Sequence, residues 1–491
     1  MTRYLCFAAI VAALGGLLFG FDTAVINGAT TQLEKVFGFD ETNYEHWGQS
    51  LTGLRDLLGY AEIEWGPLLA NFLKGFAIAS ALIGTIFGAL FISKPSDKIG
   101  RKKTLIWMAL FLFVSAVGSA FAWDCMSFVI FRFIGGIGVG GSSVVAPMYI
   151  AEISPAKYRG RLVTVFQFNI VLGILLAFFS NYLISKADFG VNAWRWMFGM
   201  ECLPAIAFFG LLFFNPRSPR WLVSQNRVDE ARDVLDVFGS DTGNAKAEIA
   251  EIQEALAEES KFKKEKLFQR KYFKPLWIAA FIAIFNQLSG INVVMYYSGE
   301  IFEMAGVDKS NALLQTIALG GINFIVTLLA LSVIDKLGRR LLLIVGSIGY
   351  IISLFAMAAV FYTKEGSLGF LSELLLDGEA FSKTGQMVLL AGMLLFVSSH
   401  AFGCGAVIWV YLSEIFPNKI RARGQAFASS CLWIACALIT WLFPPIVKVL
   451  SPGAPFLFFG VCMIVLLFWA IFIMFETKNV PLEEIERKWA S

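Results

Sequence analysis

The chain has 491 residues, of which 57% are hydrophobic and only 16% are charged, and its formal net charge is +3. A soluble protein carries about a quarter charged residues, so this composition excludes an ordinary soluble domain and indicates a protein embedded in lipid. The seven cysteines are scattered through apolar runs and the chain has only two histidines, a pattern that supports neither a disulfide framework nor a metal centre.

Twelve apolar stretches are long enough to cross a bilayer, which takes about 20 mostly apolar residues. We expect them near residues 5–28, 67–91, 104–122, 126–149, 162–184, 194–214, 275–302, 311–334, 341–362, 386–411, 425–449 and 455–475. Each is expected to be a helix, because a helix satisfies its own backbone hydrogen bonds in hydrocarbon. The first stretch resembles a signal peptide, but it is long enough to span and lacks a small-x-small cleavage site, so we expect it to be retained. The predicted fold class is therefore an all-α membrane protein.

The order of these stretches predicts four regions. They are an N-terminal six-helix half (1–215), a linker with short helices (216–274), a C-terminal six-helix half (275–475) and a tail (476–491). The linker has helical spacing from Val228 to Glu259 and then turns basic, which is typical of surface helices near anionic lipid. It is too small for a catalytic domain and the chain has no P-loop, so we expect neither enzyme activity nor ATP-driven pumping.

The loop charges predict the orientation. Residues 94–103 contain five basic residues, and the later loops on the same side are also basic, whereas the 29–66 loop is mainly acidic. Because positive loops stay in the cytosol, both termini are expected to be cytosolic, in a multi-pass protein of the cell (inner) membrane. Lys74, within the second stretch, is expected to extend its amine to the outer surface.

Two charged motifs occur once in each half, which indicates an internal duplication. Tyr149 to Arg161 is repeated at Tyr411 to Arg423 with seven identical positions, and an Asp-x-x-Gly-Arg motif begins at Asp97 and again at Asp335. One interpretation is that these are basic loops that only hold the topology. A fixed glutamate before an arginine also predicts a cytosolic gate of ion pairs, formed by Asp97, Arg101, Glu152, Arg159, Arg220, Asp335, Arg339, Glu414 and Arg421.

These motifs resemble those of the sugar porter family of the major facilitator superfamily. The resemblance extends to Arg132-Phe-Ile-Gly-Gly, to Ser218-Pro-Arg-Trp-Leu, to Gln287-Leu-Ser-Gly-Ile-Asn and to Glu476-Thr-Lys, and it covers essentially the whole chain. Both the bacterial proton-coupled members and the facilitative glucose transporters are similar. The resemblance implies that two six-helix halves rock about a sugar site at the midplane.

A sugar site needs side chains that donate and accept hydrogen bonds at once, together with aromatic faces on which the ring can stack. Gln287, Asn292 and Tyr296 are spaced so that they can face one cavity. The alternative for such amides is to join helices within the membrane, and for Asn286 the two interpretations are equally open. The predicted sugar contacts are Phe19, Gln167, Ile174, Asn286, Gln287, Asn292, Tyr296, Asn323, His400, Trp409 and Trp433.

Three positions in and beside this set differ from the proton-coupled family members. Leu432, just before Trp433, stands where those members have a glutamine. Ile174 stands where those members have a glutamine and the facilitative members have isoleucine, and His400 stands where both groups have phenylalanine. His400 is equally compatible with a hydrogen bond to a sugar hydroxyl and with helix packing. The resemblance therefore leaves the identity of the sugar open.

Charged residues inside membrane stretches indicate function. Asp22, Arg132 and Glu201 are the candidates here, and the resemblance implies that Asp22 pairs with Arg132 and takes up the proton, while Glu201 assists proton release. An apolar environment favours the neutral acid and a nearby arginine favours the carboxylate, so such a pair can switch.

The sequence therefore predicts proton-coupled import of a pentose or hexose, such as xylose or glucose, by alternating access. The alternatives are a facilitative sugar uniporter, against which Asp22 argues, and a non-transporting sugar sensor. The expected partners are a sugar, protons and the lipid bilayer, with no nucleic acid. We expect a monomer that has no cofactor apart from the proton as coupling ion.

Overall fold

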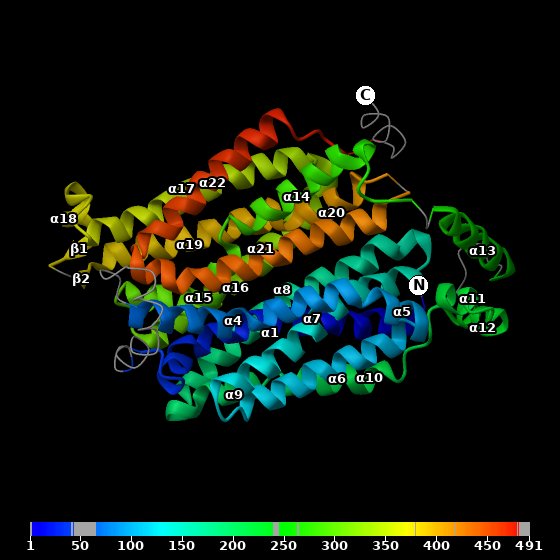
Figure 1. Ribbon diagram of the computed structural model, residues 1–491, viewed down its shortest axis with the longest axis horizontal. Coiled ribbons are helices and arrows are strands. Elements are labelled where there is room, and N and C mark those ends of the chain that lie inside the picture. Colours follow the sequence, from blue (N-terminus) through cyan, green and yellow to red (C-terminus); the bar gives the residue numbers. More distant parts are fainter. Residues whose placement is uncertain are drawn as a thin grey trace, which may run out of the picture.

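The computed structural model describes residues 2–40, 43, 65–238, 245–262, 265–378, 380–417, 419–478 and 480. Most of these residues lie in long helices that run roughly side by side (Figure 1). Among the described residues, twelve helices or helix pairs are long and apolar enough to cross a membrane. The predicted all-α membrane fold class is thus confirmed. Parts of the predicted 29–66 loop, the linker and the 476–491 tail lie outside the described residues.

The N-terminal half contains six spans. Its helices are α1 (Arg3–Val36), α4 (Trp65–Phe91), the short α5 (Ser93–Ile99), α6 (Arg101–Ala120), α7 (Cys125–Ile153), α8 (Ala156–Lys186), α9 (Ala193–Gly199) and α10 (Cys202–Leu212). Helix α1 continues well past the predicted end at residue 28. The polar residues of this extension are paired with other helices: Thr31 donates to Glu303, and Glu34 accepts from Lys74.

The C-terminal half contains the other six spans. Its helices are α14 (Phe273–Gln287), α15 (Ile291–Met304), α16 (Lys309–Leu337), α17 (Arg339–Lys364), α18 (Ser372–Leu375), α19 (Lys383–Phe402), α20 (Cys404–Glu414), α21 (Arg421–Val449) and α22 (Gly453–Phe472). A short hairpin lies between α18 and α19. Its two antiparallel strands, β1 (Leu376–Asp377) and β2 (Ala380–Phe381), have two residues each.

Three of the predicted spans are not single helices. The span at 194–214 divides into α9 and α10 next to Glu201, the span at 275–302 divides into α14 and α15, and the span at 386–411 divides into α19 and α20 at Gly403. The break between α14 and α15 includes Gly290, whose φ of 86° suits glycine and whose added Cβ would lie 2.4 Å from the ring of Phe459. Apolar length alone does not reveal such breaks, because the few polar residues beside them leave each stretch apolar enough overall to be predicted as one span.

Glycine also sets how closely α4 and α7 pack. A Cβ added at Gly84 would lie 2.1 Å from the carbonyl oxygen of Phe133, and one added at Gly136 would lie 1.9 Å from that of Ala81. The same pattern recurs one turn further along, where Gly88 faces α7 and Gly140 faces α4. Small residues at this spacing let two membrane helices approach backbone to backbone.

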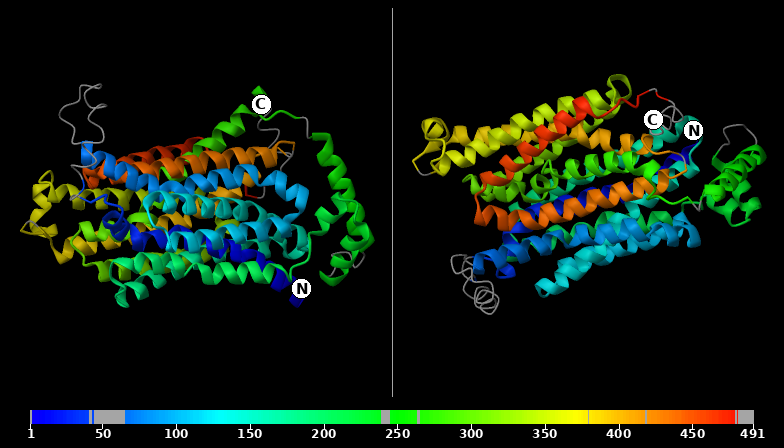
Figure 2. Two further views of the ribbon diagram at one scale, coloured as in Figure 1. Left: turned by 60° about the horizontal axis from the view of Figure 1, so that its bottom comes forward. Right: turned by 45° about the horizontal axis from the view of Figure 1, so that its top comes forward.

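The two ends of the bundle differ. One end carries α5, the N-terminus and the helices of the central segment, which are α11 (Pro219–Ser224), α12 (Val228–Phe238) and α13 (Ala245–Phe262) (Figures 1 and 2). We call this the linker end. The opposite end, which we call the distal end, carries α9, α18 and the hairpin. The central helices share a small apolar core of their own, formed by Trp221, Leu222, Val223, Ala231 and Ile249.

Candidate functional site

A cavity of about 140 Å³ lies between the two halves, beside the break between α14 and α15. The break places three amides next to one another. Gln287 donates from Nε2 to Asn286 Oδ1 at 2.9 Å, and Asn292 donates from Nδ2 to Gln287 Oε1. All three line the cavity, so this wall presents a connected row of hydrogen-bonding groups to anything bound there.

Every residue predicted to contact sugar lines this cavity. The predicted residues on its wall are Phe19, Gln167, Ile174, Asn286, Gln287, Asn292, Tyr296, Asn323, His400, Trp409 and Trp433. They come from α1, α8, α14, α15, α16, α19, α20 and α21, and therefore from both halves. That they contact a sugar stays a prediction, but the structure brings them all together.

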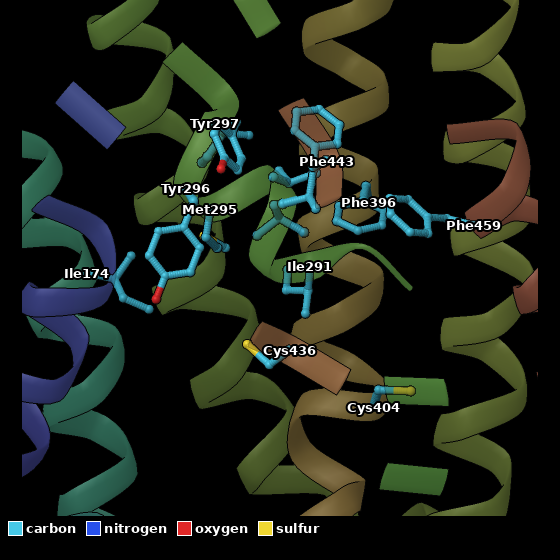
Figure 3. Packing of buried hydrophobic residues seen from close by; sticks show 14 of the residues in the cluster. Ile174, Ile291, Met295, Tyr296, Tyr297, Phe396, Cys404, Cys436, Phe443 and Phe459 are labelled. Atoms are coloured by element: carbon cyan, nitrogen blue, oxygen red, sulfur yellow. The ribbon is translucent and has the colours of Figure 1, made fainter. Parts of the chain in front are cut away.

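The aromatic and apolar parts of the wall stand apart from the amides. The rings of Phe19 and Trp433 approach with centroids 5.7 Å apart, which joins α1 of one half to α21 of the other. Tyr296 points toward Ile174 across the same interface (Figure 3). Trp409 also lines the cavity and is 44% exposed, so part of its side chain is accessible to a bound molecule.

His400 lies at the second helix break. It lines the cavity near the end of α19, and its Nδ1 is hydrogen-bonded to the hydroxyl of Tyr350 on α17. Tyr350 is completely buried, so the helix-packing interpretation is observed, and the hydrogen bond to a sugar hydroxyl stays a prediction. One edge of the imidazole packs on a neighbouring helix, and the ring still faces the cavity.

Asp22, Arg132 and Glu201 form a buried group behind the cavity wall. Arg132 donates to both carboxylate oxygens of Asp22, and its guanidinium also lies over the ring of Phe198 at 5.2 Å. Neither carboxylate oxygen of Glu201 has a hydrogen-bond partner among the described residues, although both are buried. Thr23, the neighbour of Asp22, lines the cavity with Tyr296, so the charged group and the cavity share a wall.

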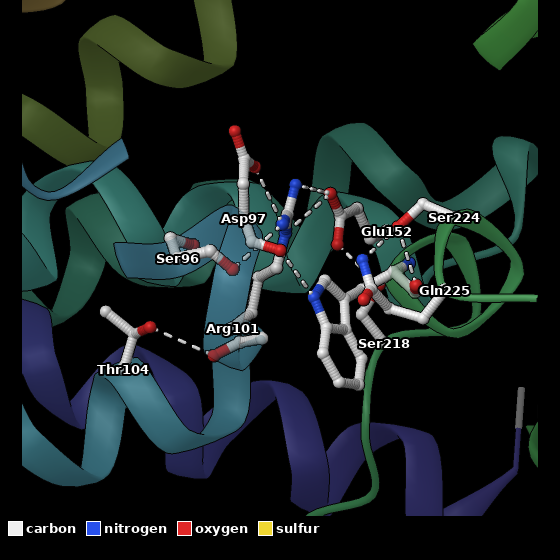
Figure 4. A network of polar contacts seen from close by, with 10 residues as sticks. Ser96, Asp97, Arg101, Thr104, Glu152, Ser218, Ser224 and Gln225 are labelled. Atoms are coloured by element: carbon white, nitrogen blue, oxygen red, sulfur yellow. Dashed lines mark hydrogen bonds and ion pairs between the residues drawn. The ribbon is translucent and has the colours of Figure 1, made fainter. Parts of the chain in front are cut away.

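The predicted gate residues form two similar clusters at the linker end. In the first half, Arg101 pairs with Glu152 at 3.1 Å and with Asp97 at 3.0 Å, while Ser218 donates to the other oxygen of Glu152 (Figure 4). The positive charge of Arg220 also interacts favourably with the carboxylate of Glu152. The segment that carries Ser218 follows directly after α10, so the start of the linker is held against α6 and α7.

The second half repeats this arrangement with different residues. Arg339 pairs with Glu414 at 2.9 Å and with Asp335 at 3.1 Å, and Thr477 donates to the other oxygen of Glu414 at 2.6 Å. In both halves, the arginine follows a glycine with positive φ, 87° at Gly100 and 91° at Gly338. The two copies of each sequence motif thus have the same local structure.

Two predicted gate residues make other contacts. Arg159 donates from Nε to the carbonyl oxygen of Ala151 at 3.1 Å, and Arg421 donates from Nε to that of Phe416 at 3.3 Å. Both bonds lie within the repeated motif itself and hold its turn. The pairs with Glu152 and Glu414 described above are formed by Arg101 and Arg339.

The expectation for Lys74 was wrong. Lys74 is only 3% exposed, and its amine lies between Glu34, at 2.7 Å, and Glu300, at 2.8 Å. Charge-assisted hydrogen bonds to two carboxylates replace the hydration of the ammonium group, so the side chain stays inside the protein. Glu34 and Lys74 belong to the N-terminal half and Glu300 to the C-terminal half. We call these three residues the distal lock.

Further bonds join the two halves beside the distal lock. The amide of Asn27 donates to the carbonyl oxygen of Met295 at 3.0 Å and to the hydroxyl of Ser298 at 2.8 Å. Trp441 donates to the carbonyl oxygen of Phe72 at 3.0 Å. These contacts close the bundle at the distal end, on the far side of the cavity from the two linker-end clusters.

Sequence reasoning missed Tyr350, Thr327 and the distal lock. Thr327 lines the cavity, but a single threonine in an apolar run has no distinguishing pattern. The partners of Lys74 lie 40 and 226 positions away along the chain. A signal was nevertheless present, because Glu34, Lys74 and Glu300 are charges in or next to apolar stretches, where a partner is expected.

Comparison with known proteins agrees with this architecture. The profile of the family described as "Sugar (and other) transporter" matches residues 8–489. The D-xylose-proton symporter of Escherichia coli K12 is 36% identical over 518 residues, which cover 99% of this chain and 96% of the symporter. The glucose transport protein of Synechocystis sp. is 35% identical (97% and 95% covered), and the arabinose-proton symporter of Bacillus subtilis is 33% identical (97% and 93% covered).

Solved structures give the same result. The xylose transporter XylE from Escherichia coli, in a partially occluded inward-open conformation, superposes with a TM-score of 0.79 at 34% identity. That match covers 98% of this chain and all of the solved chain. From the two-half helical bundle, the cavity between the halves and these matches along nearly the full chain, we conclude that this protein belongs to the sugar (and other) transporter family and has the major facilitator fold.

Proposed function

We propose that this protein imports a pentose or hexose together with a proton across the cytoplasmic membrane, by alternating access of its two halves. The observation that carries the proposal is the buried Asp22–Arg132 pair, with Glu201 beside it, directly behind a cavity lined with amides. Relatives named as proton symporters of xylose and of arabinose support the same mechanism.

The cavity suits a monosaccharide in size and chemistry. A volume of about 140 Å³ has room for roughly ten water-sized groups, which is comparable to a small sugar. Its amide row can satisfy adjacent hydroxyls, since each amide both donates and accepts. Phe19, Trp409 and Trp433 provide the aromatic faces on which the apolar side of a sugar ring can stack.

The charged group provides the coupling. In this state Arg132 donates hydrogen bonds to both carboxylate oxygens of Asp22. When the halves move and this pair loosens, a buried carboxylate without a partner is costly, so Asp22 takes up a proton. Glu201, whose carboxylate oxygens are buried and have no hydrogen-bond partner among the described residues, is then the acid to which we expect that proton to pass. Sugar binding and proton binding are linked through the wall that Thr23 and Tyr296 share with this group.

Membrane orientation and assembly belong to the same proposal. The basic motifs at the linker end support a cytosolic location for that end and for both termini, and the distal lock then closes the outer entrance. We propose that the protein works as a monomer, uses no cofactor apart from the transported proton and catalyses no chemical reaction.

Uptake into proteoliposomes tests this function. The purified protein should accumulate a labelled sugar from a panel of pentoses and hexoses when an inward proton gradient is imposed, and it should equilibrate that sugar when none is present. Asp22→Asn, which mimics a permanently protonated acid, should retain sugar binding and lose accumulation. If Asp22→Asn still concentrates sugar as the native protein does, coupling through Asp22 is wrong.

A further inference from the structure

His400 is held in one orientation by Tyr350, which lies outside the cavity lining, and by Gly405, which is part of it. Its Nδ1 is hydrogen-bonded to Tyr350, which is fully buried on α17. On its other side the ring lies over Gly405. A Cβ added there would lie 3.0 Å from Cδ2 and 3.1 Å from Nε2 of the imidazole. Because Gly405 has no side chain, the edge of the imidazole that carries Cδ2 and Nε2 has room beside the cavity.

This arrangement leaves one nitrogen for a ligand. Because Tyr350 occupies Nδ1, Nε2 is the ring nitrogen that can still bond to a molecule in the cavity. Each direction of the bond between Tyr350 and Nδ1 corresponds to one tautomer: if Tyr350 donates, Nε2 carries the proton, and if Nδ1 donates, Nε2 is an acceptor. A hydroxyl both donates and accepts, so it can pair with Nε2 in either case.

The wall around His400 lets the contact at Nε2 discriminate between sugars. The other α19 and α20 residues on the cavity are Ala401, Gly405, Ile408 and Trp409, and Trp409 is the only one with a polar side-chain atom. A bound sugar thus meets a largely apolar surface with a directed hydrogen-bonding group at His400. A ligand that lacks the matching hydroxyl leaves that group unpaired, which is a strong basis for discrimination.

We propose that His400 determines sugar specificity by bonding one particular hydroxyl through Nε2, and that Tyr350 is a positioning residue that fixes the imidazole for this contact. The proposal rests on the function proposed above and adds to it a residue pair that selects among sugars.

A scan of deoxy sugars tests the contact. For a sugar that the native protein binds, each singly deoxygenated analogue is titrated against the native protein and His400→Phe, which keeps an aromatic ring and removes both nitrogens. We expect the native protein to lose roughly 5- to 100-fold in affinity at the paired hydroxyl, and His400→Phe to lose that discrimination at this one position.

Two further variants serve as matched controls. Gln287→Ala should remove discrimination at a different hydroxyl and leave the His400 position unchanged. His400→Gln, whose amide can reach as far as Nε2, should restore part of the lost discrimination. If His400→Phe shows the native pattern of losses at every hydroxyl, the proposal is wrong. If the native protein binds none of the sugars, it is the proposed function that fails.

Nitrogen NMR tests the role of Tyr350 without depending on transport. The chain has two histidines, His46 and His400, so ¹⁵N-histidine labelling of His46→Gln reports on His400 alone. We expect a single neutral tautomer whose Nε2 signal moves on sugar addition, and a mixture of tautomers in Tyr350→Phe. A mixture in the parent protein, or an Nε2 signal that ignores sugar at saturation, overturns the proposal even if His400→Phe fails to fold.

Discussion

Replacing Lys74 by methionine should open the distal end of the bundle. Lys74 joins Glu34 of its own half to Glu300 of the other half at 2.7 and 2.8 Å. When the halves separate at this end, Lys74 can keep Glu34 but must release Glu300. Only the closed state therefore contains the full lock, and Lys74→Met acts on that state: it removes the cation and leaves two carboxylates facing each other.

The size of the effect follows from burial. Removing one partner of a fully buried ion pair costs about 3–5 kcal/mol. The carboxylates here are 23% and 16% exposed, so water offsets part of this cost, and we expect the closed state to lose about 2 kcal/mol. That loss changes the ratio of closed to open protein by about 30-fold. Glu300→Gln should have a smaller effect, because it breaks the pair without leaving two opposed charges.

Distances between spin labels measure this shift directly. Val191 in the N-terminal half and Phe370 in the C-terminal half are 71% and 81% exposed, and both lie in short 3₁₀ turns, Gly190–Asn192 and Gly369–Leu371, at the distal end. With labels at these positions in a background that lacks the native cysteines, Lys74→Met should show a larger population at long distance than the parent protein.

Two lysine variants provide the controls. Lys74→Arg keeps the charge and should resemble the parent. Lys364→Met removes a lysine from the same end whose amine lies over the ring of Phe381, and it should also leave the distances unchanged. If Lys74→Met gives the same distance distribution as these two controls, the distal lock does not stabilise the closed state.

Four more predictions concern single residues. Gln287→Ala should weaken sugar binding at least several-fold in a calorimetric titration, because hydroxyls lose a partner in a dry pocket; unchanged affinity in folded protein would remove Gln287 from the site. Ile174→Gln should shift preference from glucose toward xylose in competition uptake, because it replaces an apolar edge by a polar one; a native protein that already strongly prefers xylose counts against this. Arg159→Ala should slow transport more than it weakens equilibrium binding, and intact transport would exclude Arg159 from the gate. Burial raises the pKa of Glu476, but backbone N–H groups of neighbouring residues outweigh this effect and hold the pKa below its ordinary value. The contribution of Glu476 to the folding stability is therefore complete above about pH 4.3 and is lost as the pH falls through the lower folded-state pKa. Glu476→Gln should flatten that part of a stability-against-pH curve, and an unchanged curve refutes the argument.

Much of the cavity could be predicted because its residues contrast with their surroundings. An amide in an apolar helix stands out in the sequence, and the spacing of Gln287 and Asn292 predicted that they face one cavity, which the structure confirms. The same contrast identified Asp22 and Arg132, which the structure pairs. Contacts of this kind can be predicted from the sequence because each partner is a polar or charged residue that is unusual in an apolar helix.

Other features depend on distances that the sequence does not contain. Tyr350 is one aromatic residue among many in an apolar span, and only its contact with His400 gives it a role. The break at Gly403 and the lock around Lys74 likewise depend on which helices meet. Lys74 looked like a residue for the membrane surface because its two carboxylates come from other helices.

The paired clusters at the linker end have a practical consequence for protein engineering. Glu152 is bonded by Ser218, just beyond α10, and Glu414 by Thr477, just beyond α22, so each half is completed by the few residues that leave its last helix. A fluorescent or affinity tag fused directly after Phe475 would remove Thr477 and leave Glu414 with only its arginine. Fusion sites chosen beyond Lys478, which itself bonds the carbonyl oxygen of Lys336, preserve both clusters.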